Sequence, residues 1–149
     1  MARTIFERVN IASCDPAASI AFYRRLGVEI PEPSVWRMKT GIHHASALIA
    51  AEGAAELDID SAAFAQLWNT GWRGRSDLAG RVVVGFKLAT RETVEVAYAE
   101  ATGTGHKGLQ PPYDAFWGAR YAMVEDPDGI AAGLMSPIDP ARKTAPPEV

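Results

Sequence analysis

Two segments of this sequence repeat the same order, a strand followed by a capped helix, half a chain apart. Thr4 to Cys14 alternates imperfectly between apolar and polar residues, and Asp15 and Pro16 then supply a helix N-cap and first turn. Arg81 to Ala89 alternates in the same way and leads into Thr90, another N-cap residue. The caps lie 75 positions apart (90 − 15) in a chain of 149 residues. The repeat therefore predicts two similar modules that share the chain about equally.

Each predicted helix carries an apolar stripe and ends near a glycine. In the first the stripe is Ala18, Phe22 and Leu26, with Gly27 as the terminator. In the second it is Val94, Ala97, Tyr98 and Ala101, with Gly103 as the terminator.

The remaining elements complete a tandem βαβββ pattern, which is an α+β fold. Further strands are predicted at residues 43–50, 55–60, 120–125 and 130–136, with a short helix at 62–69. The turn sequence Asp126-Pro127-Asp128-Gly129 joins the last two strands as a hairpin. We assign residues 1–78 to the first module with its linker (73–78), 79–138 to the second, and 139–149 to a tail with little regular structure, within one compact domain overall.

Composition excludes several classes of protein. The net charge is −3 and the basic residues form no stripe, so no nucleic-acid partner is expected. The apolar runs are too short for a membrane span, and no signal peptide is evident. Cys14 is the only cysteine, which excludes an internal disulfide and favours a cytoplasmic location. Free cysteines are most often buried, and we expect Cys14 to be a buried structural thiol.

Two motifs on this repeat resemble the vicinal oxygen chelate superfamily, which includes glyoxalases, extradiol dioxygenases and bleomycin-resistance proteins. One is Phe22-Tyr23-Arg24-Arg25-Leu26-Gly27 after the capped strand. The other is Phe116-Trp117-Gly118-Ala119-Arg120-Tyr121, followed by Glu125 and the Asp-Pro-Asp-Gly turn. The resemblance implies paired modules whose sheets curl around a cavity, often in a homodimer. In catalytic members it also implies a divalent metal that activates two substrate oxygens.

Most positions that the resemblance assigns to metal ligands hold unsuitable residues here. The position of the first ligand lies seven residues before the helix-opening Asp15. Arg8 occupies it here, and its guanidinium has no lone pair that could bind a metal. The corresponding position before Thr90 is Val83, and the acid expected four residues after Gly129 is Gly133. Only Asp58 keeps a carboxylate, and one carboxylate does not make a metal site. We therefore expect no cofactor.

Alternation along the strands places a second set of residues toward the cavity: Arg8, Asn10, Asp58, Lys87, Gly133 and Met135. We hypothesise that Arg8 replaces the positive charge of the metal and pairs with Asp58 or with an anionic ligand; the alternative is a surface arginine. Trp117 and Tyr121 are the aromatic residues expected to contact the ligand, and Arg120 is expected to point outward. For Trp36, Trp68, Trp72, Tyr113 and Phe116, packing in the core or at an interface is the competing interpretation.

The histidines leave an alternative open. His43 and His44 are neighbours on a strand, so at most one faces the cavity, and a displaced metal site could use His44, Glu56 and Asp58. His106 is interpreted as a loop residue.

The sequence thus predicts a protein that binds a small aromatic or anionic molecule without a metal. The alternative is a metal-dependent lyase, isomerase or dioxygenase with relocated ligands. A third class is a cofactor-free enzyme that uses Arg8, Asn10 or Tyr121.

Overall fold

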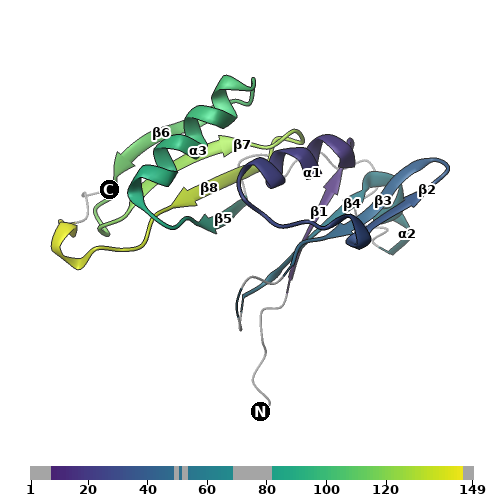
Figure 1. The fold of residues 1–149 in the computed structure, drawn as a ribbon, viewed down its shortest axis with the longest axis horizontal. Helices are drawn as coiled ribbons and strands as arrows, with labels where there is room; N and C mark the ends of the chain where they lie inside the picture. Colours follow the sequence, from purple (N-terminus) through teal and green to yellow (C-terminus); the bar gives the residue numbers. More distant parts are fainter. Residues whose placement is uncertain (1–7, 49–50, 52–53, 69–81, 146–149) are drawn as a thin grey trace, which may run out of the picture. The chain divides into compact units, whose positions relative to one another are not determined.

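The chain folds as two compact units, residues 1–75 and 76–149, each built around a four-stranded mixed sheet (Figure 1). The computed structural model describes residues 8–48, 51, 54–68 and 82–145. The predicted linker at 73–78, Trp72 and the side chain of Trp68 lie outside this part.

The first unit has the strand order β1-β4-β3-β2. β1 pairs in parallel with β4, and the other neighbours are antiparallel. Its elements are β1 (Arg8–Ser13), α1 (Pro16–Arg25), the 3₁₀ helix η1 (Glu32–Ser34), β2 (Val35–Met38), β3 (Gly41–Ser46), β4 (Glu56–Ser61) and α2 (Ala62–Trp68).

The second unit repeats this order as β5-β8-β7-β6, with β5 and β8 parallel. Its elements are β5 (Val83–Lys87), α3 (Arg91–Gly103), β6 (Gly108–Asp114), β7 (Arg120–Glu125), β8 (Ala131–Met135) and the 3₁₀ helix η3 (Pro140–Arg142). The α+β fold of tandem βαβββ modules that the sequence predicts is therefore confirmed.

Both helix starts use the predicted caps. The carboxylate of Asp15 accepts a hydrogen bond from the backbone N–H of Ala18 at 3.0 Å, and Thr90 forms a reciprocal capping box with Thr93. Gly27 has φ +88°, so it ends α1 in the predicted left-handed turn. α3 ends at Gly103 as predicted, and Gly105 takes the left-handed conformation in the turn that follows, at φ +94°.

Each sheet buries one face under its own helix, α1 against β3 and β4, and α3 against β6, β7 and β8 (Figure 1). On α1 the predicted stripe is only partly correct: Phe22 is buried, but Ala18 and Leu26 are half-buried. Tyr23 and Ser19 are buried in their place, and the Ser19 hydroxyl lies 2.8 Å from that of Ser13 on β1. This hydrogen bond explains how a polar residue can face the core.

The structure also contains two strands that were not predicted, β2 and β6. β6 contains Pro111 and Pro112, which lack backbone N–H donors, and it lies at the edge of its sheet, where such residues are tolerated.

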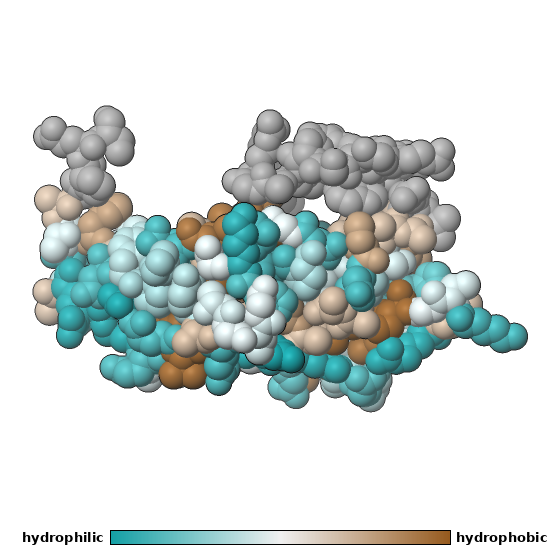
Figure 2. All heavy atoms as spheres, turned by 90° about the horizontal axis from the view of Figure 1, so that it is seen from above, coloured by the Kyte–Doolittle hydropathy of each residue, from teal (hydrophilic) through white to brown (hydrophobic). Residues whose placement is uncertain are grey.

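Over the face seen in Figure 2, hydrophilic and hydrophobic residues are interspersed. Within the described residues, no helix is both long enough and apolar enough to cross a membrane.

Candidate functional site

In the first unit, Arg8 binds two carboxylates on the face of the sheet opposite α1. Parallel pairing of β1 with β4 places Arg8 beside Glu56, and Nη2 lies 2.8 Å from Glu56 Oε2. Nη1 donates to Asp58 Oδ2 at 2.9 Å. The Arg8–Asp58 pair expected from the sequence is therefore present.

Asn10 extends this network along β1. Its side-chain amide donates to Asp60 Oδ2 at 2.9 Å and approaches Asp58 Oδ2 at 3.4 Å. Asp58 and Asp60 are both buried, so the guanidinium and the amide compensate carboxylates that would otherwise be costly to desolvate. Asp58 Oδ1 is buried and has no hydrogen-bond partner in the described part of the chain.

His44, which the sequence offered only as part of an alternative metal site, completes the hydrogen-bond network from β3. Its Nδ1 lies 2.6 Å from Asp60 Oδ1, and its Nε2 lies 2.9 Å from the hydroxyl of Ser46. Glu56, another member of the displaced metal set, binds Arg8 instead. Among the described residues, no three His, Cys, Asp or Glu side chains come together as a metal-binding group.

In the second unit, the strand register forms a row of side chains across the face opposite α3. Lys87 on β5 pairs with Met135 on β8, which pairs with Tyr121 on β7, which pairs with Tyr113 on β6. Residues that pair across a sheet share a face. Lys87 is exposed, and Met135 and Tyr121 are half-buried.

Four aromatic rings gather at one end of this row. The centroid of Trp117 lies 5.0 Å from Phe116, 5.5 Å from Tyr121 and 6.4 Å from Tyr113. All of these contacts are edge-to-face, an arrangement that aromatic rings prefer. Burial raises the pKa of Tyr121, and the neighbouring Tyr113 raises it further, so the phenol stays neutral well above neutral pH.

The phenol of Tyr121 occupies the space that a side chain at position 133 would need. A Cβ atom built on Gly133 would lie 2.5 Å from Tyr121 Oη and 3.2 Å from a methyl carbon of Val83. Gly133 is the position that the resemblance assigns to an acidic ligand. The phenol of Tyr121 therefore fills the space in which an acidic side chain at position 133 would lie.

The residues at the ligand positions that the resemblance assigns can now be compared with what a divalent metal requires. Arg8 brings a cation to the first position, Val83 offers no donor atom at the second, and the phenol fills the space at Gly133. Of the relocated candidates, His44 has both ring nitrogens in hydrogen bonds. The residues present do not fit the metal site of the superfamily.

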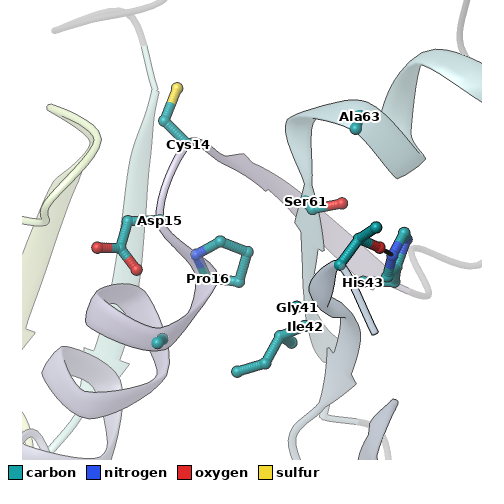
Figure 3. A pocket seen from close by; sticks show the side chains of 10 residues that line it. Cys14, Asp15, Pro16, Gly41, Ile42, His43, Ser61 and Ala63 are labelled. Atoms are coloured by element: carbon teal, nitrogen blue, oxygen red, sulfur yellow. Dashed lines mark hydrogen bonds between the residues drawn. The ribbon is translucent and has the colours of Figure 1, made fainter. Parts of the chain in front are cut away.

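A hollow of about 410 Å³ opens elsewhere in the first unit, between the start of α1, the start of β3 and the start of α2 (Figure 3). His43 lines it, with Nε2 2.8 Å from the hydroxyl of Thr40. Cys14 also borders it, although its thiol points away from His43 and Ser61 in Figure 3. The expectation of a buried thiol was wrong: Cys14 is exposed, because it lies just after the last residue of β1 at the edge of the sheet.

Other predicted residues lie apart from these groups. Arg120 donates hydrogen bonds to Glu95 on α3 and to Asp114 at the end of β6. The hydrogen bond from Arg120 lowers the pKa of the Asp114 carboxyl. His106 lies in the loop between α3 and β6, as expected. Trp36 packs against His43 and Phe64.

Comparison with known proteins decides the family. The sequence profile of the Glyoxalase/Bleomycin resistance protein/Dioxygenase superfamily matches residues 5–134. The chain belongs to this superfamily. Among curated proteins, none matches the sequence significantly.

Solved structures of the superfamily share this fold. A glyoxalase/bleomycin resistance protein/dioxygenase family enzyme from Burkholderia phytofirmans PsJN is 18% identical, with a TM-score of 0.71 over 89% of this chain and 98% of that one. A glyoxalase/bleomycin resistance protein/dioxygenase from Nocardioides is 20% identical, with a TM-score of 0.65 over 93% and 87%. A glyoxalase-related enzyme from Fulvimarina pelagi is 17% identical, with a TM-score of 0.68 over 88% and 86%. At these identities the likeness shows the fold alone.

Sequence reasoning missed two members of the polar network in this glyoxalase-superfamily chain, Asp60 and Ser46. Glu56, Asp58 and Asp60 alternate along β4, so the period of two places all three on one face. That alternation could have indicated Asp60. Ser46 gave no signal, because its role depends on the position of the His44 ring.

Proposed function

We propose that this member of the glyoxalase superfamily binds a small, planar, aromatic anion on the open face of the second sheet, without a metal. The observation that carries the proposal is the row from Lys87 through Met135 and Tyr121 to Tyr113, with Trp117 packed against both tyrosines. It combines a cation, a polarisable thioether and aromatic rings on one surface.

The aromatic group supports binding of a planar molecule. Tyr113 and Phe116 are 36% and 39% exposed, so large apolar surface remains accessible although the rings contact one another. A ligand ring that stacks on them gains about 0.5–1.5 kcal/mol per aromatic pair beyond the area it buries. Met135 lies in the middle of the row, and methionine adapts to ligand shape.

Lys87 supports an anionic group on that ligand. Its Cα lies two strands from that of Tyr121, which at the usual strand spacing is about 10 Å. A lysine side chain can cover part of that distance, so an aromatic carboxylate or sulfonate can contact both groups.

The first unit supports independence from a metal. Arg8 supplies a positive charge beside Asp58 and Glu56, where the superfamily resemblance implied a metal ligand. We propose that Arg8, Asn10 and Asp58, expected from the sequence to contact ligand, instead stabilise this sheet through their mutual hydrogen bonds.

The proposal is tested with anilinonaphthalene sulfonate, a planar aromatic anion whose fluorescence rises on binding. Trp117→Ala and Lys87→Gln are each expected to weaken binding about 5- to 50-fold, which corresponds to about 1–2.3 kcal/mol. Lys39→Gln is the matched control, because it removes the same charge from an exposed position in the first unit. Equal affinity in Lys87→Gln, Trp117→Ala and the wild-type protein would exclude this surface as the binding site.

The homodimer that the resemblance implies belongs to the same proposal. Light scattering of the purified protein measures its mass directly. We expect twice the chain mass of 16.0 kDa, and the chain mass itself would remove the dimer from the proposal.

A further inference from the structure

Three residues of the first unit form a continuous hydrogen-bond chain from a hydroxyl to a buried carboxylate. Ser46 Oγ lies 2.9 Å from His44 Nε2, and His44 Nδ1 lies 2.6 Å from Asp60 Oδ1. We propose that Ser46, His44 and Asp60 form a nucleophile–base–carboxylate triad that makes Ser46 an acylation site for small carboxylic esters. This inference depends on the first unit alone and not on the aromatic surface of the second.

The strand geometry explains why the three side chains meet. His44 and Ser46 are two residues apart on β3, so they point to the same face. The register pairs His44 with Asp60 across β3 and β4. Adjacent strands therefore hold the hydroxyl, the imidazole and the carboxylate in one line.

The partners of Asp60 determine the tautomer of His44. Asp60 Oδ2 already accepts a hydrogen bond from the Asn10 amide, and an ionised carboxylate can only accept. His44 therefore donates from Nδ1 to Asp60 Oδ1, which leaves Nε2 of the neutral ring as the acceptor for the Ser46 hydroxyl. This is the tautomer that a general base needs.

Burial is graded along the chain as such a triad requires. The Asp60 side chain is 2% exposed and that of His44 is 28% exposed, while Ser46 is half-buried. The ring of Phe64 packs edge-on to His44, with centroids 6.3 Å apart. The base is thus held in place, and the hydroxyl is within reach of solvent.

The reaction follows from these positions. Ser46 Oγ attacks the ester carbonyl carbon, and its proton passes to His44 Nε2. The tetrahedral intermediate then expels the alkoxide or phenolate, which leaves as the alcohol or phenol after taking that proton, and an acyl ester remains on Ser46. Water can later cleave this ester, with His44 first taking a proton from the water and then returning it to Ser46.

Charge near Ser46 limits both the substrate and the rate. Arg8 pairs with the carboxylates of Glu56 and Asp58, whereas the third carboxylate of the network, Asp60, is bound by Asn10 and His44. Within the described residues, this network therefore holds more acidic than basic side chains. Asp58 lies opposite Ser46 in the register, and it disfavours negative charge on the reacting carbonyl oxygen. We therefore expect slow, stoichiometric acylation by neutral esters and weaker reaction with anionic ones.

The test is acylation of the full chain with p-nitrophenyl acetate, followed by peptide mass mapping. One acetyl group on the peptide that contains Ser46 is expected, and His44→Gln should slow its formation at least about 100-fold. The anionic p-nitrophenyl succinate half-ester should react more slowly than the acetate.

His43 and Thr40 provide the matched control. Their nitrogen–oxygen distance is 2.8 Å, but within the described residues no carboxylate contacts His43. His43→Gln should therefore leave acetylation of Ser46 unchanged. Acetylation confined to lysines or tyrosines, no acetylation, or equal rates in His44→Gln and His43→Gln would overturn the proposal. The mass map of the wild-type protein can overturn the proposal by itself, so the test does not depend on whether a variant folds.

Discussion

Replacing Gly133 with alanine directly tests the contact that excludes the acidic ligand of the superfamily. The added methyl carbon would lie 2.5 Å from Tyr121 Oη, whereas ordinary contact begins at about 3.4 Å, so the phenol must move by about 0.9 Å (3.4 − 2.5). The Tyr121 ring is packed against Trp117 and Tyr113, with centroids 5.5 and 6.1 Å away. We expect this overpacking to cost about 1–3 kcal/mol.

Gly85 provides the reference for the backbone effect of the same substitution. It pairs with Gly133 across β5 and β8, and a Cβ built on it meets no atom within 4 Å. Gly85→Ala should therefore stabilise the protein by about 0.5–1 kcal/mol, because alanine restricts the unfolded chain. The free energy of unfolding of both variants is measured by urea denaturation, and the difference between them gives the overpacking cost.

Tyr121→Phe isolates the responsible atom. Without Oη, the nearest contacts of the new methyl carbon become Tyr121 Cζ and Val83, both at 3.2 Å. In that background the difference between Gly133→Ala and Gly85→Ala should fall below about 1 kcal/mol. Equal unfolding free energies for the two alanine variants in the wild-type background would refute the claim that the phenol occupies this space.

Three further predictions concern stability. Arg8→Met should lower the free energy of unfolding by about 1–3 kcal/mol, since it leaves the buried Asp58 without its cation, whereas the exposed Arg25→Met should change it by less than about 0.5 kcal/mol in the same urea titration. Thr90→Ala should cost about 0.5–2 kcal/mol through loss of the α3 cap, measured by thermal unfolding, and no loss would argue against the capping box. Burial raises the pKa of Tyr121 in the folded state above 10.0. The contribution of the neutral phenol to stability is therefore present below that pH and is lost as pH rises through the raised pKa. Melting temperatures measured from about pH 9 to 12 should fall less steeply in Tyr121→Phe than in the wild-type protein.

The sequence predicted the repeated architecture because its evidence is local. Caps at Asp15 and Thr90, strand alternation and the Asp-Pro-Asp-Gly turn each act within a few residues of the chain. β6 was not predicted because Pro111 and Pro112 disfavour a strand unless the strand is known to lie at a sheet edge. Propensity alone cannot supply that tertiary information.

The candidate sites were predictable as faces but not as contacts. Alternation correctly grouped Arg8, Asn10 and Asp58, and the Arg8–Asp58 pair could be inferred from their charges. The role of His44 could not be inferred from the sequence. Strand register and side-chain rotamer determine which of the three carboxylates on β4 its ring contacts, and in the structure this is Asp60. Those quantities depend on pairings between distant segments.

The affinity for anilinonaphthalene sulfonate with and without a metal chelator tests metal-independent binding most directly. The titration is carried out on protein dialysed against the chelator, and then with Mn²⁺, Ni²⁺ or Zn²⁺ added. If Lys87 and the aromatic group bind the ligand, the dissociation constant stays the same in all of these conditions. Binding that is lost with the chelator and restored by one of the metals would contradict the account.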